Sequence, residues 1–297
     1  MHEAITYSFT HPTETEWFTT LNGKVKPVAL SMPMSEDRSV LRTSFIPSLL
    51  DVASYNRNRK IEDVSLFEVG SVYITEEETL SALPQEVPVL AVLMTGKHTA
   101  SQWNVQARTV DFYDIKGALE SLFAHLGLTD RIRYAADRPV GYHPGRSASI
   151  FLSTDEGEQL LGTLGQIHPD LQRTKDLGET YVAELLLQPV IDAADFHIEY
   201  NTLPRFPAVE RDLALVMERG AEVGPLLDKV KETAGSLLED VGVFDVYTGD
   251  RIASDMKSVA ISLVYRHPER TFTDEEITEL HGRVIAALES EGVQLRK

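Results

Sequence analysis

The C-terminal third of the sequence changes its hydrophobic period in an order that few folds can accommodate. Within residues 211–217, Leu213, Leu215 and Met217 stand at every second position, which is typical of a strand with one buried face. Over residues 223–238 the apolar side chains recur at intervals of three and four, as in an amphipathic helix. The chain is therefore expected to pass from a strand into a helix.

Two more strands are expected after that helix. Residues 241–247 are rich in β-branched and aromatic side chains, and residues 258–266 again alternate between apolar and polar positions. Gly249 and Asp250 predict the turn that joins them.

A second helix is predicted from a capping signal. The Thr273 hydroxyl can accept a hydrogen bond from the Glu276 N–H group while the Glu276 carboxylate reaches back to the Thr273 N–H group. The apolar stripe that follows ends before Gly292, and residues 293–296 suit a short last strand. The order strand, helix, strand, strand, helix, strand predicts a ferredoxin-like βαββαβ domain over residues 203–297.

Residues 1–200 are expected to form a larger domain, and the two prolines of Leu203–Pro207 suit a linker. Helical periodicity is present in 47–58 and 111–126, whereas strand-like runs occupy 64–73, 87–94, 148–152, 160–164 and 181–187. Many strands, few helices and hairpin-like spacing predict an antiparallel sheet with helices on one face. The fold class expected for the whole chain is α+β.

Composition narrows the functional classes. No apolar run approaches the roughly 20 residues of a membrane-spanning helix, and the N-terminus lacks the pattern of a secretory signal. The absence of cysteine excludes disulfides and thiolate sites, which fits the cytoplasm. A formal net charge of -18 argues against broad nonspecific binding of nucleic acid, so we expect no DNA partner, and any RNA site must be local.

Two classes of site are not indicated by any motif. The nine histidines show no spacing that suits a metal site, so we expect no metal. The sequence contains neither a Gly-rich phosphate loop ending in Lys-Ser or Lys-Thr nor a Gly-x-Gly-x-x-Gly motif after a strand. The nucleotide-binding folds that depend on those loops are therefore excluded.

Motifs spread along nearly the whole chain resemble one family. They are Ser35–Ser44 (SEDRSVLRTS), which leads into Ile46–Leu50, then Phe67–Gly70 (FEVG), Asp111–Gly117 (DFYDIKG), Tyr142–Ala148 (YHPGRSA), Leu161–Pro169 (LGTLGQIHP), Arg205–Leu215 (RFPAVERDLAL), Phe244–Tyr247 (FDVY) and Arg270–Glu276 (RTFTDEE). In this order, and together with the βαββαβ pattern, they resemble the C-terminal portion of the bacterial phenylalanyl-tRNA synthetase β subunit.

The resemblance implies a role for each domain. Residues 1–200 would be a degenerate class II synthetase catalytic-like domain that has lost catalysis and serves as a scaffold for the catalytic α subunit. Residues 203–297 would be the anticodon-binding domain for tRNA(Phe). The family is a hetero-tetramer that uses ATP and Mg, but the resemblance implies no catalytic group and no cofactor on this chain, and it places further modules upstream.

Four residues within the motifs of the first domain invite a catalytic interpretation. Class II sites use arginines to neutralise ATP phosphates, which makes Arg42 and Arg146 candidates. The segment after Arg146 alternates as a strand and opens no helix, so we interpret Arg42, Glu68, His143 and Arg146 as structural residues.

RNA contact requires basic side chains for phosphates and planar side chains for bases. The candidates in the second domain are Arg205, Phe206, Arg211, Tyr247, Lys257, Arg266, Arg270 and Arg296. Residues 201–297 hold 12 Lys and Arg against 18 Asp and Glu, which predicts that these basic residues cluster on one face. The alternative is that Phe206 and Tyr265 are core residues and that Arg211 forms a surface ion pair with Asp212.

Two other functions remain open at this point. Small ferredoxin-like domains host many activities, so the second domain could be a metabolite-binding regulatory domain fused to an unrelated α+β module. An independent synthetase is the other alternative, and ATP–pyrophosphate exchange by the chain would reveal it.

Overall fold

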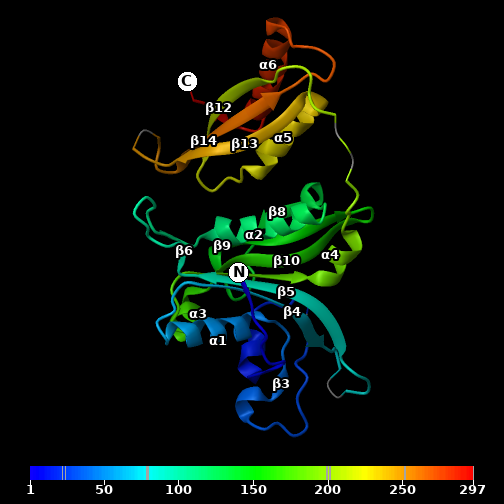
Figure 1. Ribbon diagram of the computed structural model, residues 1–297, viewed down its shortest axis with the longest axis vertical. Helices are drawn as coiled ribbons and strands as arrows, with labels where there is room; N and C mark the ends of the chain where they lie inside the picture. Colours follow the sequence, from blue (N-terminus) through cyan, green and yellow to red (C-terminus); the bar gives the residue numbers. More distant parts are fainter. Residues whose placement is uncertain are drawn as a thin grey trace. The chain divides into compact units, whose positions relative to one another are not determined.

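The computed structural model describes residues 1–21, 23, 25–77, 80–198, 200, 202–250 and 252–296. The chain divides into two compact units, Met1–Ile198 and Glu199–Lys297 (Figure 1). Each unit has its own hydrophobic core and is described separately below.

The first unit is built on a seven-stranded sheet with the strand order β1-β4-β5-β11-β10-β9-β8. Its sheet strands are β1 (His2–Glu3), β4 (Val64–Ile74), β5 (Gln85–Thr95), β8 (Ile132–Ala136), β9 (Tyr142–Thr154), β10 (Gly157–Ile167) and β11 (Thr180–Leu186). Two small pairs accompany the sheet, β2 (Phe9–Thr10) with β3 (Val40–Leu41) and β6 (Lys97–Thr99) with β7 (Arg108–Thr109). Its helices are α1 (Ile46–Arg57), α2 (Phe112–His125), α3 (Pro169–Thr174) and α4 (Leu187–Ala193), with single 3-10 turns at Pro12–Glu16, Glu36–Arg38 and Thr129–Arg131.

The predicted sheet is correct in its long strands and wrong in two respects. The edge pair β1–β4 is parallel, so the sheet is mixed and not purely antiparallel. Helices also cover both faces, because α2 and α4 contribute to one core cluster and α1 to the other (Figure 1). The prediction of helices on only one face overlooked the continuous apolar run of β5. A strand that is buried on both faces does not alternate between apolar and polar residues.

The second unit is a four-stranded sheet with the order β13-β14-β12-β15 and two helices. Its elements are β12 (Val209–Glu218), α5 (Gly224–Ala234), a 3-10 turn at Gly235–Leu237, β13 (Leu238–Tyr247), β14 (Met256–Tyr265), α6 (Asp274–Ser290) and β15 (Gln294–Leu295). The predicted ferredoxin-like order is confirmed. So is the capping box, in which Glu276 N–H donates to the Thr273 hydroxyl and Thr273 N–H donates to the Glu276 carboxylate.

Alternation along the strands of the second unit explains its architecture. Leu213, Leu215 and Met217 of β12 lie in one core with Leu226 of α5 and Val284 of α6. Both helices therefore cover the same face of the sheet, which leaves the side chains at the intervening strand positions on the opposite face.

Candidate functional site

The face of the four-stranded sheet opposite α5 and α6 is the first candidate surface. Strand register places on it Asp212, Ala214, Val216, Asp245, Tyr247, Ser258, Ala260, Ser262 and Gln294, and we call this set the open face. Its central positions are Ala and Ser, whose short side chains extend only a little way from the backbone of the sheet. A flat ligand can therefore approach the backbone beside the larger side chains.

Tyr247 and Arg296 meet on this open face. Tyr247 ends β13 opposite Ser258, and the Arg296 N–H group donates to the Ala214 carbonyl at 2.8 Å. The Arg296 guanidinium lies 5.7 Å from the centre of the Tyr247 ring. A cation and an aromatic ring on one sheet surface are what single-stranded RNA requires for phosphate contact and base stacking.

Asp245 is a third group here, although no sequence pattern marked it as a candidate. Asp245 pairs with Ala260 and Tyr247 with Ser258, so ordinary strand alternation places both side chains on the open face. The register irregularity between Val243 and Asp245 separates them from Val243, which pairs with the core residue Ile261. The Asp245 side chain is exposed and can accept hydrogen bonds from the amino or imino groups of a base. The FDVY motif contains Asp245, but its pairing with Ala260 of β14 shows which face of the sheet it occupies.

Phe206, Arg205 and Arg266 lie together elsewhere on the second unit. Arg266 donates to the Phe206 carbonyl and forms an ion pair with Glu239 at 2.8 Å. These residues and Arg205 line a pocket of about 660 Å³. The Arg266 charge is therefore already neutralised within the chain.

The remaining basic candidates are dispersed. Arg270 makes two hydrogen bonds to the Glu276 carboxylate at 2.5 and 2.6 Å, and these hold the pKa of Glu276 at about 2. The Lys257 ammonium donates to a backbone carbonyl, and burial lowers its pKa. Arg211 lies on the helix side of the sheet, where its charge lowers the pKa of His281 after the larger effect of burial. The eight candidates therefore do not form the single basic face expected from the sequence.

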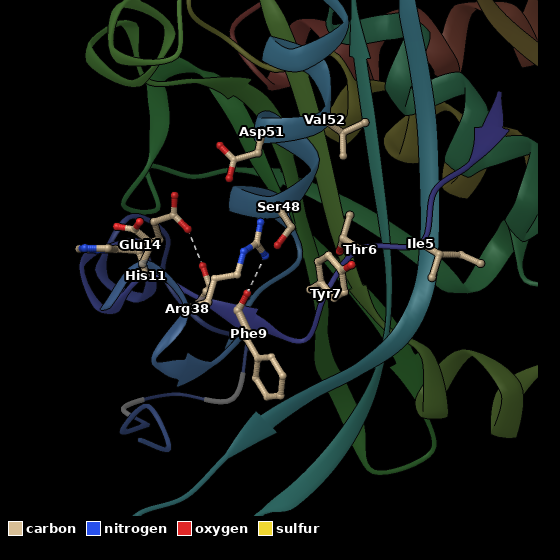
Figure 2. A pocket seen from close by; sticks show the side chains of 12 residues that line it. Ile5, Thr6, Tyr7, Phe9, His11, Glu14, Arg38, Ser48, Asp51 and Val52 are labelled. Carbon is tan, nitrogen blue, oxygen red and sulfur yellow. Dashed lines mark hydrogen bonds between the residues drawn. The ribbon is translucent and has the colours of Figure 1, made fainter. Parts of the chain in front are cut away.

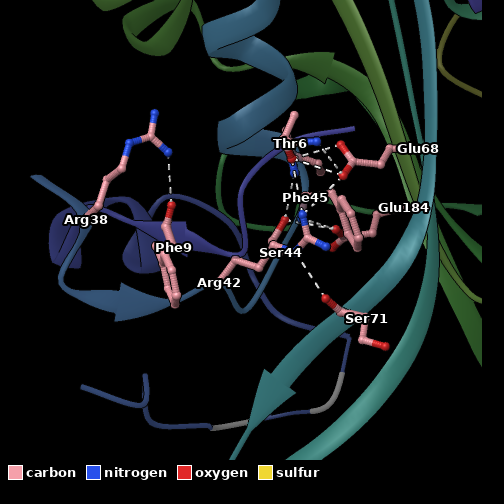
Figure 3. Close-up of polar contacts among 10 residues, drawn as sticks. Thr6, Phe9, Arg38, Arg42, Ser44, Phe45, Glu68, Ser71 and Glu184 are labelled. Atoms are coloured by element: carbon pink, nitrogen blue, oxygen red, sulfur yellow. Dashed lines mark hydrogen bonds and ion pairs between the residues drawn. The ribbon is translucent and has the colours of Figure 1, made fainter. Parts of the chain in front are cut away.

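The first unit contains a buried polar cluster around Arg42 (Figure 3). The Arg42 guanidinium donates to the Glu68 carboxylate at 3.2 Å, the Thr6 hydroxyl at 3.1 Å and the Ser71 carbonyl at 3.0 Å. It also stacks on the Phe45 ring, 3.6 Å from the ring centre. Burial lowers the Arg42 pKa, and the Glu68 charge opposes that effect.

Gly70, the last residue of the FEVG motif, makes room for this stack. A Cβ atom at Gly70 would lie 3.0 Å from the Phe45 ring and 3.2 Å from the Arg42 guanidinium. A side chain there would force both groups to move, which gives the glycine a packing role.

Glu184 adds a second buried carboxylate to the cluster. Both Glu68 of β4 and Glu184 of β11 lie opposite Ala91 of β5, the strand between them, so they face the same side of the sheet. Glu184 accepts hydrogen bonds from the Phe45 N–H group at 2.7 Å and the Ser44 hydroxyl at 3.0 Å, at the start of α1. Burial raises the pKa of Glu184 to about 7 despite these two donors.

His143 and Arg146 occupy β9, outside the Arg42 cluster. The Arg146 guanidinium donates to Gln166 at 2.9 Å and to Glu179 at 3.1 Å, and the Glu179 hydrogen bond raises the Arg146 pKa. His143 accepts a hydrogen bond from the Gly145 N–H group at 3.1 Å within its own turn. The polar contacts of both side chains therefore lie within the chain.

A pocket of about 450 Å³ opens between the N-terminal segment and α1 (Figure 2). Its wall includes Ile5, Tyr7 and Phe9, all exposed, together with Arg38 and Asp51. The Arg38 guanidinium donates to the Phe9 carbonyl at 3.3 Å and lies 5.1 Å from the centre of the Tyr7 ring. The pocket thus combines apolar side chains with charges that line its rim.

Two other features are absent from the described residues, a metal site and a membrane-spanning helix. Within them, no three His, Asp or Glu side chains are grouped so as to hold a metal ion. In the same part of the chain, no helix has the length and hydropathy needed to cross a membrane.

Each of the two units matches a known protein family. The family described as phenylalanyl tRNA synthetase beta chain CLM domain matches residues 1–187, and the ferredoxin-fold anticodon binding domain matches residues 204–296. The chain is 45% identical over 297 residues to the phenylalanine–tRNA ligase beta subunit of Geobacillus kaustophilus (strain HTA426) and 43% identical over 297 residues to that of Shouchella clausii (strain KSM-K16). It is 40% identical over 289 residues to that of Bacillus subtilis (strain 168).

These matches cover 97–100% of this chain but only 35–36% of the relatives. The chain thus spans about a third of the length of the curated relatives that it matches. Because one family description accounts for most of the first unit and a second for nearly all of the other, the chain belongs to the family of phenylalanyl-tRNA synthetase β chains.

Proposed function

We propose that this chain is a non-catalytic part of a phenylalanine–tRNA ligase β subunit, corresponding to its C-terminal portion. Residues 1–200 would hold the catalytic α subunit, and residues 203–297 would bind tRNA(Phe) near its anticodon. One observation carries the second role: the domain matched by the anticodon-binding family presents Tyr247, Arg296 and Asp245 on an open sheet face. The assembly would act in the cytoplasm as a hetero-tetramer.

The state of Arg42 supports a class II-like domain without catalysis. An arginine that binds ATP phosphates needs donors that are free to reach them. The donors of Arg42 are engaged by Glu68, Thr6 and Ser71, and its side chain is buried. ATP and Mg would therefore be bound by the α subunit, which would carry out the chemistry.

Exposed apolar side chains near α1 support a protein partner for the first unit. Ile5 and Tyr7 line the pocket beside α1 and are 92% and 71% exposed, and exposed apolar side chains that lie together are typical of an interface. Size exclusion of the chain mixed with the α subunit of the same organism tests this role. We expect the two proteins to elute together. The scaffold role would be contradicted if both proteins were folded and eluted separately while a full-length β subunit, as the control, bound the α subunit.

Binding of tRNA(Phe) tests the second role. We expect the chain to shift the anisotropy of labelled tRNA(Phe), and to bind more weakly a transcript in which only the anticodon is replaced. Equal binding of the two transcripts would contradict the anticodon contact. If amino acids raised the melting temperature while tRNA(Phe) did not bind, the metabolite-binding alternative would replace it.

A further inference from the structure

Residues 97–109 form a hairpin arm that is separate from the seven-stranded sheet (Figure 1). Strands β6 and β7 pair at its base, and Gln102 and Val105 exchange backbone hydrogen bonds of 3.0 and 3.4 Å near its end. Trp103 and Asn104 are the two residues of the closing loop. The Trp103 side chain is 95% exposed, so almost the whole indole ring is open to a ligand.

The base of the arm is fixed to the body of the unit. The Lys97 N–H group donates to the Asp63 carboxylate at 2.7 Å. Asp114 binds both strands, since Arg108 donates to it at 2.6 and 2.7 Å and His98 Nδ1 lies 3.2 Å away. The Arg108 hydrogen bonds lower the pKa of Asp114, so the carboxylate stays ionised at neutral pH.

Gly96 fixes the start of the arm. Its φ of +84° is accessible to glycine at little cost, and a Cβ there would come within 2.4 Å of the Glu62 carbonyl oxygen. These anchors position the arm before any ligand binds, so that presenting Trp103 requires little further loss of conformational entropy.

The tip of the arm differs chemically from the rest of the chain. Residues 99–107 contain no ionisable side chain, although the chain has 46 Asp and Glu and 28 Lys and Arg. The side chains around Trp103 are Ser101, Gln102, Asn104 and Gln106, which can donate hydrogen bonds and accept them. The tip therefore does not repel an anionic partner in the way that the acidic surface does.

We propose that the arm is a second RNA contact, in which Trp103 stacks on an unpaired base of the tRNA. The inference rests on the proposed function, because it takes tRNA as the partner. An indole ring offers a stacking platform to any base, and the neighbouring amides can hydrogen-bond to base edges. The contact lies in the first unit and is distinct from the Tyr247 surface of the second.

The surroundings of Trp103 favour RNA over a protein partner. Protein interfaces surround an anchoring Trp with further apolar side chains that exclude water. Here Val105, 38% exposed, is the one large apolar neighbour within the described tip. A single ring among amides matches one base better than it matches a hydrophobic pocket.

Tryptophan fluorescence tests the contact directly, because the chain has only Trp17 and Trp103. In a Trp17→Phe background, saturating tRNA(Phe) is expected to quench Trp103 emission by about half through base stacking. Trp103→Ala is expected to weaken tRNA(Phe) binding by roughly fivefold to a hundredfold, and Trp103→Phe by less than about threefold. The quenching should survive added salt better than the total affinity, because the tip has no cation.

Leu83→Ala provides the matched control, since Leu83 is also 95% exposed in a loop of the same unit. It should leave tRNA binding unchanged, and neither variant should alter the melting temperature. If tRNA(Phe) binds without quenching Trp103 and Trp103→Ala binds normally, the inference is overturned while the proposed function stands. A blue shift of Trp103 on adding the α subunit, without quenching by tRNA, would make the arm a protein anchor, and absence of any tRNA binding would overturn both ideas.

Discussion

The polar side chains of the two sheets are used in opposite ways. On the seven-stranded sheet, Glu68 and Glu184 are buried, and they bind Arg42, which follows β3, and the start of α1. On the open face of the four-stranded sheet, Asp245 is exposed and Tyr247 contacts Arg296 at the surface. A charged motif residue therefore indicates function only when the fold leaves its polar atoms free.

The difference follows from how many faces of each sheet are covered. Helices lie on both sides of the large sheet, so any polar side chain on its central strands must find its partners inside the protein. Both helices of the small sheet lie on one side, which leaves the other side for a ligand.

The largest expected effect comes from Arg42→Ala. It leaves Glu68 buried without its cation, and breaking a buried pair in this way costs roughly 3–5 kcal/mol. Denaturant unfolding followed by tryptophan fluorescence measures this, because both tryptophans are in the first unit. Arg173→Ala is the control, since Arg173 is 75% exposed in its pair with Asp170. Equal stability of the two variants would mean that the Arg42 cluster is not structural.

Glu184 should make the stability of the first unit depend on pH. Its folded pKa of about 7 exceeds the ordinary value of 4.5, so the folded state retains a proton that the unfolded state has lost. The unfolding free energy should therefore fall as pH rises from about 4.5 to 7, by up to roughly 3 kcal/mol. Glu184→Gln keeps an acceptor for Phe45 and Ser44 and should flatten this slope. A wild-type slope that persists in the variant would assign the pH dependence to other groups.

Tyr247→Ala should affect binding and not folding. Loss of one stacking platform is expected to weaken tRNA(Phe) binding by about 1–3 kcal/mol, whereas Tyr247→Phe keeps the ring and most of the affinity. Phe244→Ala is the control for Tyr247→Ala. Phe244 is an aromatic residue of the same strand and is 60% exposed, but it lies at the register irregularity and is not part of the open face. Fluorescence anisotropy of tRNA(Phe) compares the three variants, and an equal loss for Phe244→Ala would show that the open face has no special role.

The smallest effect is expected from Thr273→Ala. Removing the cap of α6 leaves the Glu276 N–H group without its side-chain acceptor and should cost about 1 kcal/mol. The loss should appear in the unfolding of the second unit, followed by far-UV circular dichroism, while tryptophan fluorescence of the first unit stays unchanged. Thr278→Ala, within the same helix, should have a smaller effect.

Local signals predicted the elements better than the surfaces. The alternation of β12 and β14 and the capping box of α6 specify the second unit, because each reflects contacts between neighbours in sequence. The edge strand β1 has only two residues and pairs with β4 more than sixty residues away, so no local pattern could place it. The predicted basic face failed for the same reason: Glu239 of another strand pairs with Arg266, and Arg211 and Arg296 lie on opposite sides of the sheet.

The sequence by itself determined the βαββαβ order, the long strands of the first unit and the family, since periodicity, caps and motifs are properties of short segments. The tertiary structure alone decided which charged side chains are satisfied internally. It buried Arg42 against Glu68, left the face of the small sheet with Asp245 and Tyr247 uncovered by helices, and held Trp103 at the end of an anchored arm. The physical reason is that burial and pairing depend on residues far apart in the chain, whose proximity is fixed only when the sheets and helices pack.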